Sequence, residues 1–482
     1  MELEDKKLKV LIVSSEVAPY AKSGGLGDVA GSLPKALKKL GVDVRVVLPK
    51  YKTIKTEYFN DVKYLGSFNT NLSWRNQKAG VLLKETEFPV YFIENDYYFY
   101  RDGLYGYGDD NERFAFFSKA TLDMLSFIDF YPDIIHCNDW QTGPLCLFLK
   151  ETYRKFIYYS NIKTLYTIHN LQYQGNFGRE TMDLLDVPDY CFTNGNIEFY
   201  GNVSYMKAGL MYADKISTVS NTYADEIQTE QYGYGMDGVL RFKRDNLCGI
   251  INGIDFNENN PATDSRLFKN FDVNSLDIKK ENKRELQKEL GLEERDVPII
   301  SIISRLADQK GLDLVAQIFD ELMNEDVQFV VLGTGEARYE HMFRFFEHKY
   351  KGKVSANIMF DGNLAQRIYA SSDMFLMPSL FEPCGLGQMF SLRYGTVPIV
   401  RKTGGLADTV FHYNTETKEG NGFVFETYDG NGLLWAIREA LKVYRMGSDE
   451  WNTVVKNAMN CNYSWENSAK KYVELYESIK NQ

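Results

Sequence analysis

The most constraining feature of this sequence is a repeated order of apolar run, glycine-containing loop, helical pattern and second apolar run. Residues 8–15 (LKVLIVSS) form the continuous apolar run of a buried parallel strand. A loop leads to a helical pattern over 28–41, with Asp28 as the expected cap and Gly41 as the expected stop, and then to a strand over 42–49. Further strands are predicted at 80–84, 89–93, 133–137, 163–168 and 214–219. This order predicts a parallel sheet with helices on both faces.

The second half of the chain repeats the same order after a polar stretch over 257–283. Strands are predicted at 297–305, 327–333, 357–362, 373–379 and 396–401, and helices at 311–324 and 336–350. The expected fold class is α/β, with two doubly wound, Rossmann-like parallel-sheet domains that face each other across a deep cleft. We expect one domain over 1–248 and one over 249–482, with a last helix at about 465–480 that packs back on the first domain.

Composition excludes several classes of protein. The chain has 55 Lys and Arg against 66 Asp and Glu, a net charge of −11, so a general binder of nucleic acid or anionic membrane is not expected. Its six cysteines form no C-x-x-C pair, and neither a disulfide framework nor a zinc site is predicted. The first residues form no apolar leader, and no apolar run approaches the roughly 18 residues of a membrane span. We expect a cytoplasmic protein.

One seven-residue motif occurs twice, at 22–28 (KSGGLGD) and at 402–408 (KTGGLAD). Each copy follows a predicted strand and precedes a predicted helix. The Gly-Gly pair lets the backbone come close to a ligand, and the next helix offers free N–H groups to an anion. Two ordinary turns that agree by chance remain the alternative.

Two further segments lie just after predicted strands of the second half. In 304–311 (SRLADQKG), Arg305 and Lys310 can converge on one anion such as a diphosphate, unless they are an ordinary surface pair. In 379–387 (SLFEPCGLG), Glu382 is a candidate acceptor for sugar hydroxyls, and the N–H groups of 385–387 lie at an expected helix start. A glutamate in a first helical turn is also favoured by the helix dipole alone.

Histidines are rare, and two of the five end predicted strands of the first half: His136 in HCNDW and His169 in TIHN. Both positions place polar side chains where a loop meets the expected cleft, although a strand-end histidine is often a structural residue. The G-x-G-x-x-G at 233–238 follows no strand, and neither a P-loop nor a D-x-D pair is present. A dinucleotide-dependent oxidoreductase and a divalent metal site are therefore disfavoured.

With these motifs assembled, the sequence resembles the bacterial glycogen synthases and plant starch synthases, which are retaining glucosyltransferases of the GT-B fold. The resemblance runs from Val10 to about Tyr476. It is carried by 22–29, 110–114, 136–140, 167–170, 173–175, 198–201, 207–210, 252–255, 304–311, 382–386 and 403–406. It implies transfer of glucose from ADP-glucose to the non-reducing 4-hydroxyl of an α-1,4-glucan, with retention and without a metal or other cofactor.

The resemblance also implies roles for individual residues. Those implied for catalysis are Arg305, Lys310, His169, Glu382 and Asp139. Those implied for the donor are Lys22, Gly24, Gly25, Asn170, Asn252, Phe360 (on adenine), Cys384, Gly385 and Leu386. Those implied for the acceptor are Glu16, Asp28 and Asp139. Since no carboxylate is named as a nucleophile, the working hypothesis is a front-face route in which the departing phosphate deprotonates the acceptor.

The sequence departs from this family's pattern at three places. Asn138 replaces a second histidine, Asn259 replaces a tryptophan, and Met359-Phe360 replaces a Gly-Tyr pair. Two alternative functions stay open. One is an inactive glucan-binding scaffold of the same fold, and the other is a retaining GT-B transferase with a small acceptor.

Overall fold

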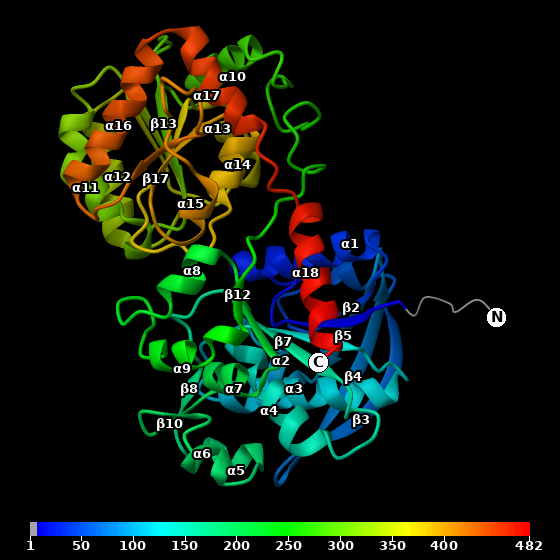
Figure 1. Cartoon of the computed structure of the whole chain (residues 1–482). Helices are drawn as coiled ribbons and strands as arrows, with labels where there is room; N and C mark the ends of the chain where they lie inside the picture. Colours follow the sequence, from blue (N-terminus) through cyan, green and yellow to red (C-terminus); the bar gives the residue numbers. More distant parts are fainter. Residues whose placement is uncertain (1–6) are drawn as a thin grey trace. The chain divides into compact units, whose positions relative to one another are not determined.

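A computed structural model describes residues 7–482 and divides the chain into two compact units. Of the described residues, those up to Gly253 together with Trp465–Gln482 form unit 1, and Ile254–Ser464 form unit 2 (Figure 1). Each unit has its own sheet and its own apolar core. Within the described residues, no helix combines the length and the apolar character needed to cross a membrane.

The sheet of unit 1 has nine strands in the order β12-β11-β7-β6-β1-β2-β5-β4-β3. The strands are β1 Lys9–Val13, β2 Asp43–Pro49, β3 Lys63–Leu72, β4 Arg75–Glu85, β5 Pro89–Glu94, β6 Ile134–Asn138, β7 Lys163–Ile168, β11 Lys215–Thr218 and β12 Leu247–Gly249. Strands β12 to β5 are parallel, as predicted, but β4 and β3 are antiparallel. The predicted parallel-sheet architecture is confirmed, and β4 and β3 extend its edge as an antiparallel hairpin, because the two-residue link between these two strands is long enough only for a hairpin.

The helices of unit 1 cover both faces of this sheet (Figure 1). They are α1 Gly25–Lys39, α2 Asp96–Phe99, α3 Asp110–Phe127, α4 Gly143–Phe148, α5 Thr181–Leu185, α6 Tyr190–Thr193, α7 Tyr205–Tyr212, α8 Asn221–Glu226, α9 Asp237–Phe242 and α18 Trp465–Lys480. Short strands β8 Asn176–Phe177, β9 Glu198–Phe199 and β10 Asn202–Ser204 form a separate small sheet. Helix α1 begins at Gly25, three residues before the expected cap, and Asp28 lies in its first turn; Gly41 follows the helix with φ +89°, as expected of a stop.

Helix α18 brings the end of the chain back onto unit 1, where it packs against α1 (Figure 1). Tyr472, Tyr476 and Ile479 on this helix are fully buried. Ser468 Oγ donates to the carbonyl of Ile251 at 2.7 Å, and the Tyr476 hydroxyl lies 2.8 Å from His136 Nδ1. The last helix is thus part of the first core.

Unit 2 contains an all-parallel sheet of six strands, in the order β15-β14-β13-β16-β17-β18. Its strands are β13 Ile299–Ile303, β14 Gln328–Leu332, β15 Val354–Asn357, β16 Met374–Met377, β17 Val397–Arg401 and β18 Phe423–Phe425. Its helices are α10 Asp277–Glu289, α11 Leu312–Leu322, α12 Ala337–Lys349, α13 Gly362–Ser371, α14 Gly387–Arg393, α15 Gly404–Thr409, α16 Gly430–Arg445 and α17 Ser448–Met459. The predicted doubly wound architecture is confirmed for this half.

One predicted strand of unit 2 is wrong. The strand predicted at 357–362 is absent: β15 ends at Asn357, residues 358–361 form a loop, and α13 begins at Gly362. Asp361 ends that loop by capping α13, since its Oδ1 accepts hydrogen bonds from the N–H groups of Asn363 at 2.8 Å and Leu364 at 3.0 Å. A short polar side chain that caps a helix outweighs the weak strand pattern around it.

Candidate functional site

In unit 2, the candidate residues lie in loops at the carboxyl ends of the parallel strands. The loop after β13 carries Arg305 and Lys310, and the loop after β16 carries Glu382. The structure joins these loops, because Lys310 Nζ lies 2.7 Å from Glu382 Oε2. Ser379 Oγ donates to the same carboxylate oxygen at 3.0 Å. The ion pair is largely buried, with the lysine and glutamate side chains 20% and 8% exposed.

Arg305 differs from Lys310 in having no carboxylate partner in the part of the chain that the structure describes. Its guanidinium makes only a long hydrogen bond, 3.5 Å, to Gln309 Oε1, and the residue is exposed. Ser304 Oγ, next to it, is buried without a hydrogen-bond partner among residues 7–482. A cation without a counter-ion beside an unsatisfied hydroxyl is an arrangement suited to an anionic ligand.

Glycines allow the neighbouring loops of unit 2 to touch backbone to backbone. A Cβ on Gly311, whose φ is +67°, would lie 2.0 Å from the Pro378 carbonyl, and a Cβ on Gly335 would lie 2.1 Å from that of Leu306. The glycines at 333–335, which do not complete a dinucleotide motif, therefore serve to pack the β14 loop against the β13 loop. Sequence reasoning missed this packing role.

The two copies of the repeated motif have different surroundings. In unit 2, a Cβ on Gly404 or Gly405 would lie 2.0 or 2.1 Å from the carbonyl of Glu382 or Cys384, and the Gly405 N–H donates to Glu382 O at 3.1 Å. In unit 1, nothing lies within 4 Å of a Cβ built on Gly24 or Gly25. In the second copy, the glycines are therefore packed against their own domain, whereas open space lies beside Gly24 and Gly25 in the first copy.

Residues 384–386 lead into α14. Cys384 is buried, Gly385 has φ +74°, and Leu386 is the N-cap residue but supplies no capping side chain. Gln388 Nε2 donates to the carbonyls of Cys384 and Gly385, at 3.0 and 2.9 Å. The carbonyls of this segment are thus occupied by the protein.

In unit 1, Glu16 holds the open glycine loop in place. Its Oε2 accepts from the N–H groups of Ser23 at 2.5 Å and Gly24 at 3.2 Å, and its Oε1 accepts from Ser23 Oγ and the Tyr105 hydroxyl. Glu16 is buried. The structure therefore engages both oxygens of this predicted acceptor-side carboxylate with the loop.

Lys22 and Asp28, on the same loop and helix start, pair with each other at 2.7 Å. Burial raises the pKa of the Asp28 carboxyl, and the positive charge of Lys22 opposes this shift. Lys22 is about half exposed, at 46% of its side chain. Its charge is therefore available to a ligand that shares it with Asp28.

Asp139 and His169 lie together at the ends of β6 and β7. Asp139 Oδ1 accepts from the backbone N–H of His169 at 2.7 Å, and Asp139 has a φ of +55°. Burial raises the pKa of Asp139 to about 7, with a contribution from the Glu16 charge, although the backbone hydrogen bonds act in the opposite direction. Burial lowers the pKa of His169 to about 3.

The second strand-end histidine, His136, is held by hydrogen bonds to other side chains of unit 1. Its Nδ1 lies 2.8 Å from the Tyr476 hydroxyl of α18, and its Nε2 lies 2.6 Å from Thr167 Oγ1. Burial, followed by the nearby His169, lowers the pKa of His136 to about 3. His136 therefore belongs to the core of unit 1. The sequence motif alone could not distinguish it from His169 in this respect.

The three remaining residues predicted to contact the donor are Asn252, Asn170 and Phe360, and they differ in burial and hydrogen bonding. Asn252 Oδ1 is buried without a hydrogen-bond partner in residues 7–482, whereas Asn170 Oδ1 accepts from the N–H of Gln172 at 3.0 Å. The ring of Phe360, in the loop between β15 and α13, is 92% exposed and is free to stack on a planar group. No group of three or more His, Cys, Asp or Glu among the described residues could hold a metal ion.

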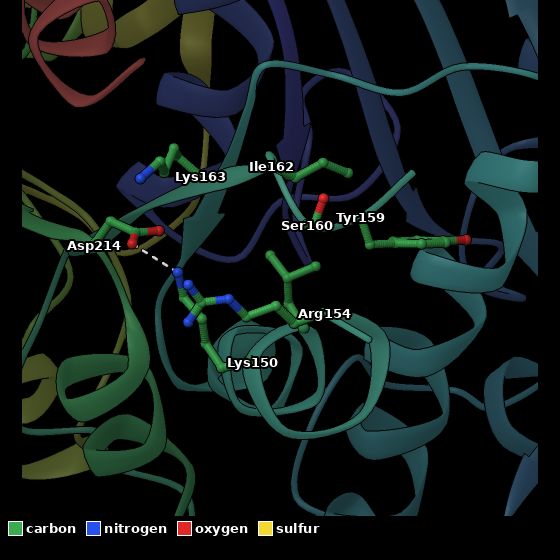
Figure 2. A pocket seen from close by; sticks show the side chains of 8 residues that line it. Lys150, Arg154, Tyr159, Ser160, Ile162, Lys163 and Asp214 are labelled. Carbon is green, nitrogen blue, oxygen red and sulfur yellow. Dashed lines mark hydrogen bonds and ion pairs between the residues drawn. The ribbon is translucent and has the colours of Figure 1, made fainter. Parts of the chain in front are cut away.

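A surface pocket of unit 1 lies apart from the predicted residues. Figure 2 shows Lys150 beside Asp214, and these two side chains pair at 2.6 Å. The pocket is lined by Leu149, Lys150, Arg154, Tyr159, Ser160, Ile162, Lys163 and Asp214. Asp214 also accepts from the backbone and side chain of Thr164, so its carboxylate ties β7 to the segment before β11.

Comparisons with known proteins identify the family of the chain. A family model described as "Starch synthase catalytic domain" matches residues 9–242, and one described as "Glycosyl transferases group 1" matches 282–453. The glycogen synthase of Clostridioides difficile (strain 630) is 52% identical over 479 residues, covering 98% of this chain and 100% of that protein. The glycogen synthase of Desulforudis audaxviator (strain MP104C) is 53% identical and covers 98% of this chain and 96% of that protein.

Solved structures show the same fold. The catalytic domain of starch synthase IV from Arabidopsis thaliana, bound to ADP and acarbose, matches with a TM-score of 0.91 and 34% identity, over 99% of this chain and 100% of that one. A sucrose-phosphate synthase from Thermosynechococcus elongatus, 16% identical with a TM-score of 0.62 over 98% and 99% of the two chains, shares the fold alone. Fold and site define a glycosyltransferase of the GT-B class. The chain belongs to the glycogen synthase family.

The buried histidines predict a dependence of stability on pH. Between about pH 3 and 6.5, His136 and His169 bind protons in the unfolded chain but not in the folded one, so stability falls as pH falls through this window. Asp139 acts oppositely between about pH 7 and 3.8, and the raised pKa values of Asp28 and Asp123 act in the same direction as that of Asp139. Relative to wild type, we expect His136→Gln to remove a loss of stability of up to about 1.4 kcal/mol per pH unit between pH 6.5 and 4.5, measured from urea midpoints. The exposed His341→Gln is the control, and equal slopes for both variants would contradict the prediction.

Proposed function

We propose that this protein transfers glucose from ADP-glucose to the non-reducing 4-hydroxyl of an α-1,4-glucan with retention of configuration. The observation that carries the proposal is the pair of loops after β13 and β16, where Arg305 has no counter-ion among residues 7–482 and Lys310 pairs with Glu382. The family membership and the ADP named in the starch synthase IV structure support a nucleotide-sugar donor.

In unit 2, we assign Arg305 and Lys310 to the leaving diphosphate. Arg305 would supply a planar fork of donors, and Lys310 a point charge oriented by Glu382. Glu382, with the backbone of 384–386, would hold glucose hydroxyls, and Phe360 would stack on adenine. Fixed cations stabilise the negative charge that grows on the diphosphate without a reorganisation cost at the moment of reaction.

In unit 1, we assign the open backbone of Gly24 and Gly25, with Lys22, to the donor. His169, Asn170 and Asn252 would contact the donor sugar, and the unsatisfied Oδ1 of Asn252 fits that role. On the acceptor side we place Glu16, Asp28 and Asp139. The contacts of Glu16 mean that its effect would act through the glycine loop that it holds.

The proposed reaction needs no enzyme nucleophile. The bond between C1 of glucose and the phosphate oxygen breaks, and the bonding pair leaves with ADP. The acceptor 4-oxygen attacks C1 from the same face, and its proton passes to a phosphate oxygen of ADP. Positive charge at C1 is stabilised by nearby carbonyls and carboxylates while Arg305 and Lys310 stabilise the leaving group.

The proposal is tested by measuring ADP release from ADP-glucose with and without added glucan, and by competing ADP-glucose against UDP-glucose. We expect ADP release that depends on glucan and a clear preference for the adenine donor. Absence of glucan-dependent release with either donor would favour an inactive scaffold. Transfer to glucose or a short sugar in place of glucan would favour a transferase with a small acceptor.

The open glycine loop gives a further prediction. Gly25→Ala adds a methyl group where no protein atom lies within 4 Å, at the first residue of α1, so stability should not fall. If the backbone here approaches the donor, the methyl group blocks it, and kcat/KM for ADP-glucose should fall by about tenfold or more. The control is Gly108→Ala, another exposed glycine with open space around it. Unchanged kinetics in Gly25→Ala would remove this loop from the donor site.

A further inference from the structure

Asn138, at the end of β6, is a buried amide with a fully determined orientation. It is 1% exposed, and its Nδ2 donates to the carbonyl oxygens of Val13 at 3.1 Å and His136 at 3.2 Å. Carbonyl oxygens only accept hydrogen bonds, so the nitrogen must be the atom that faces them. The oxygen Oδ1 is therefore the atom that faces His169.

This orientation determines the protonation of the His169 ring. His169 Nε2 lies 2.9 Å from Asn138 Oδ1, and an amide oxygen offers only lone pairs. The hydrogen bond requires a proton on Nε2. In the neutral ring, Nδ1 then carries a lone pair and can only accept.

The surroundings keep the ring neutral and in place. The ring is buried, which disfavours the imidazolium, and the neighbouring titratable groups are His136 and the carboxyl of Asp139. The Asp139 carboxyl accepts the backbone N–H of His169 at 2.7 Å, which fixes the main chain beneath the ring. Nδ1 makes no hydrogen bond with any residue that the structure describes.

We propose that Asn138 is a positioning residue that holds His169 as the Nε2–H tautomer, so that Nδ1 accepts a hydrogen bond from a hydroxyl of the bound sugar. The inference rests on the proposed function, in which His169 contacts the donor glucose. A histidine at position 138 could likewise donate with one ring nitrogen to a carbonyl and accept with the other.

The tautomer is measured directly by nitrogen NMR of protein labelled with 15N-histidine. The chain has only five histidines, so the His169 signals can be assigned by their loss in His169→Gln. Protonated and unprotonated ring nitrogens resonate at widely separated frequencies. We expect a protonated Nε2 and an unprotonated Nδ1 from pH 7.5 to 5.5. An Nδ1–H tautomer, or an imidazolium at pH 7, would overturn the inference, and this reading needs no active enzyme.

Kinetics of Asn138 variants supply the second test. Asn138→Ala and the nearly isosteric Asn138→Leu remove the acceptor, and we expect mixed tautomers at His169 with kcat/KM for ADP-glucose lowered by roughly 10- to 100-fold. Asn138→His should keep the Nε2–H tautomer and recover most of the activity. The buried amide Asn95 donates to the carbonyl of Lys78, and Asn95→Ala is the control for loss of a buried amide outside the site.

Different results would overturn the positioning role of Asn138 and the proposed transferase activity. Normal kinetics in Asn138→Ala, or loss of activity with an unchanged His169 tautomer, would overturn the positioning role. If the wild-type protein releases no ADP in the presence of glucan, the proposed function fails, whatever the NMR spectra show. Asn138→His that keeps the tautomer but stays as impaired as Asn138→Ala would also overturn the role.

Discussion

Lys310→Ala is expected to lower kcat by roughly 100- to 1,000-fold, the effect of removing one preorganised charge from a developing anion. Lys310 Nζ is held 2.7 Å from Glu382 Oε2, so its ammonium is fixed in position before the donor binds. The alanine leaves the diphosphate without that charge and leaves Glu382 buried without its cationic partner. The measurement is the initial rate of ADP release at saturating ADP-glucose and glucan.

The matched control for this prediction is Lys349→Ala. Lys349, at the end of α12, forms an exposed pair with Asp320 at 2.7 Å and should leave kcat within about twofold, because exposed ion pairs contribute little. Lys310→Arg keeps the charge but changes its shape, and we expect partial activity. A Lys310→Ala enzyme within tenfold of wild type would refute the role at the leaving group.

Arg113→Met is expected to destabilise unit 1 by about 3–5 kcal/mol, the cost of removing one partner from a buried ion pair. Arg113 is fully buried on α3 and pairs with Asp110 one turn earlier. Its guanidinium also donates to the carbonyls of Tyr98 at 2.8 Å and Leu104 at 3.1 Å. Methionine fills similar space but leaves the Asp110 carboxylate and two carbonyls without these donors. Urea unfolding followed by circular dichroism measures the change.

A double variant distinguishes the loss of charge pairing from the loss of packing. Asp110→Asn removes the charge that Arg113→Met leaves unpaired, so the double variant should be more stable than Arg113→Met alone. Arg438→Met on α16 breaks surface ion pairs with Glu321 and Glu325 and should cost no more than about 1 kcal/mol. A double variant less stable than Arg113→Met would show that lost packing dominates.

Much of the fold could be predicted from local sequence. Continuous apolar runs located the buried strands β1 and β13 to within two residues at each end, because a strand covered on both faces is largely apolar. The strand predicted at 80–84 lies within β4, but β3 and the hairpin were missed because β3 is half exposed and carries few apolar residues in series. The strand predicted at 357–362 does not form, because Asp361 caps helix α13 there.

The sequence could predict which residues belong to the candidate site but not which of them contact one another. Arg305 and Lys310 follow β13 as the motif indicated, and open space lies beside Gly24 and Gly25, whose contact with the donor stays a prediction. The second copy of that motif, however, is filled by the loop at 382–384. Identical residues therefore have different settings, because what approaches a glycine depends on segments distant in the chain.

The sequence by itself determined the two α/β halves, their strand order along the chain and the loops that carry charge, because these depend on local periodicity and turn chemistry. Only the tertiary structure decided which polar side chains meet. Lys310 and Glu382 are 72 residues apart, and His136 and Tyr476 are 340 apart. Partners at such separations are set by how strands and helices pack, and the burial that follows keeps His136 and His169 neutral and raises the pKa of Asp139.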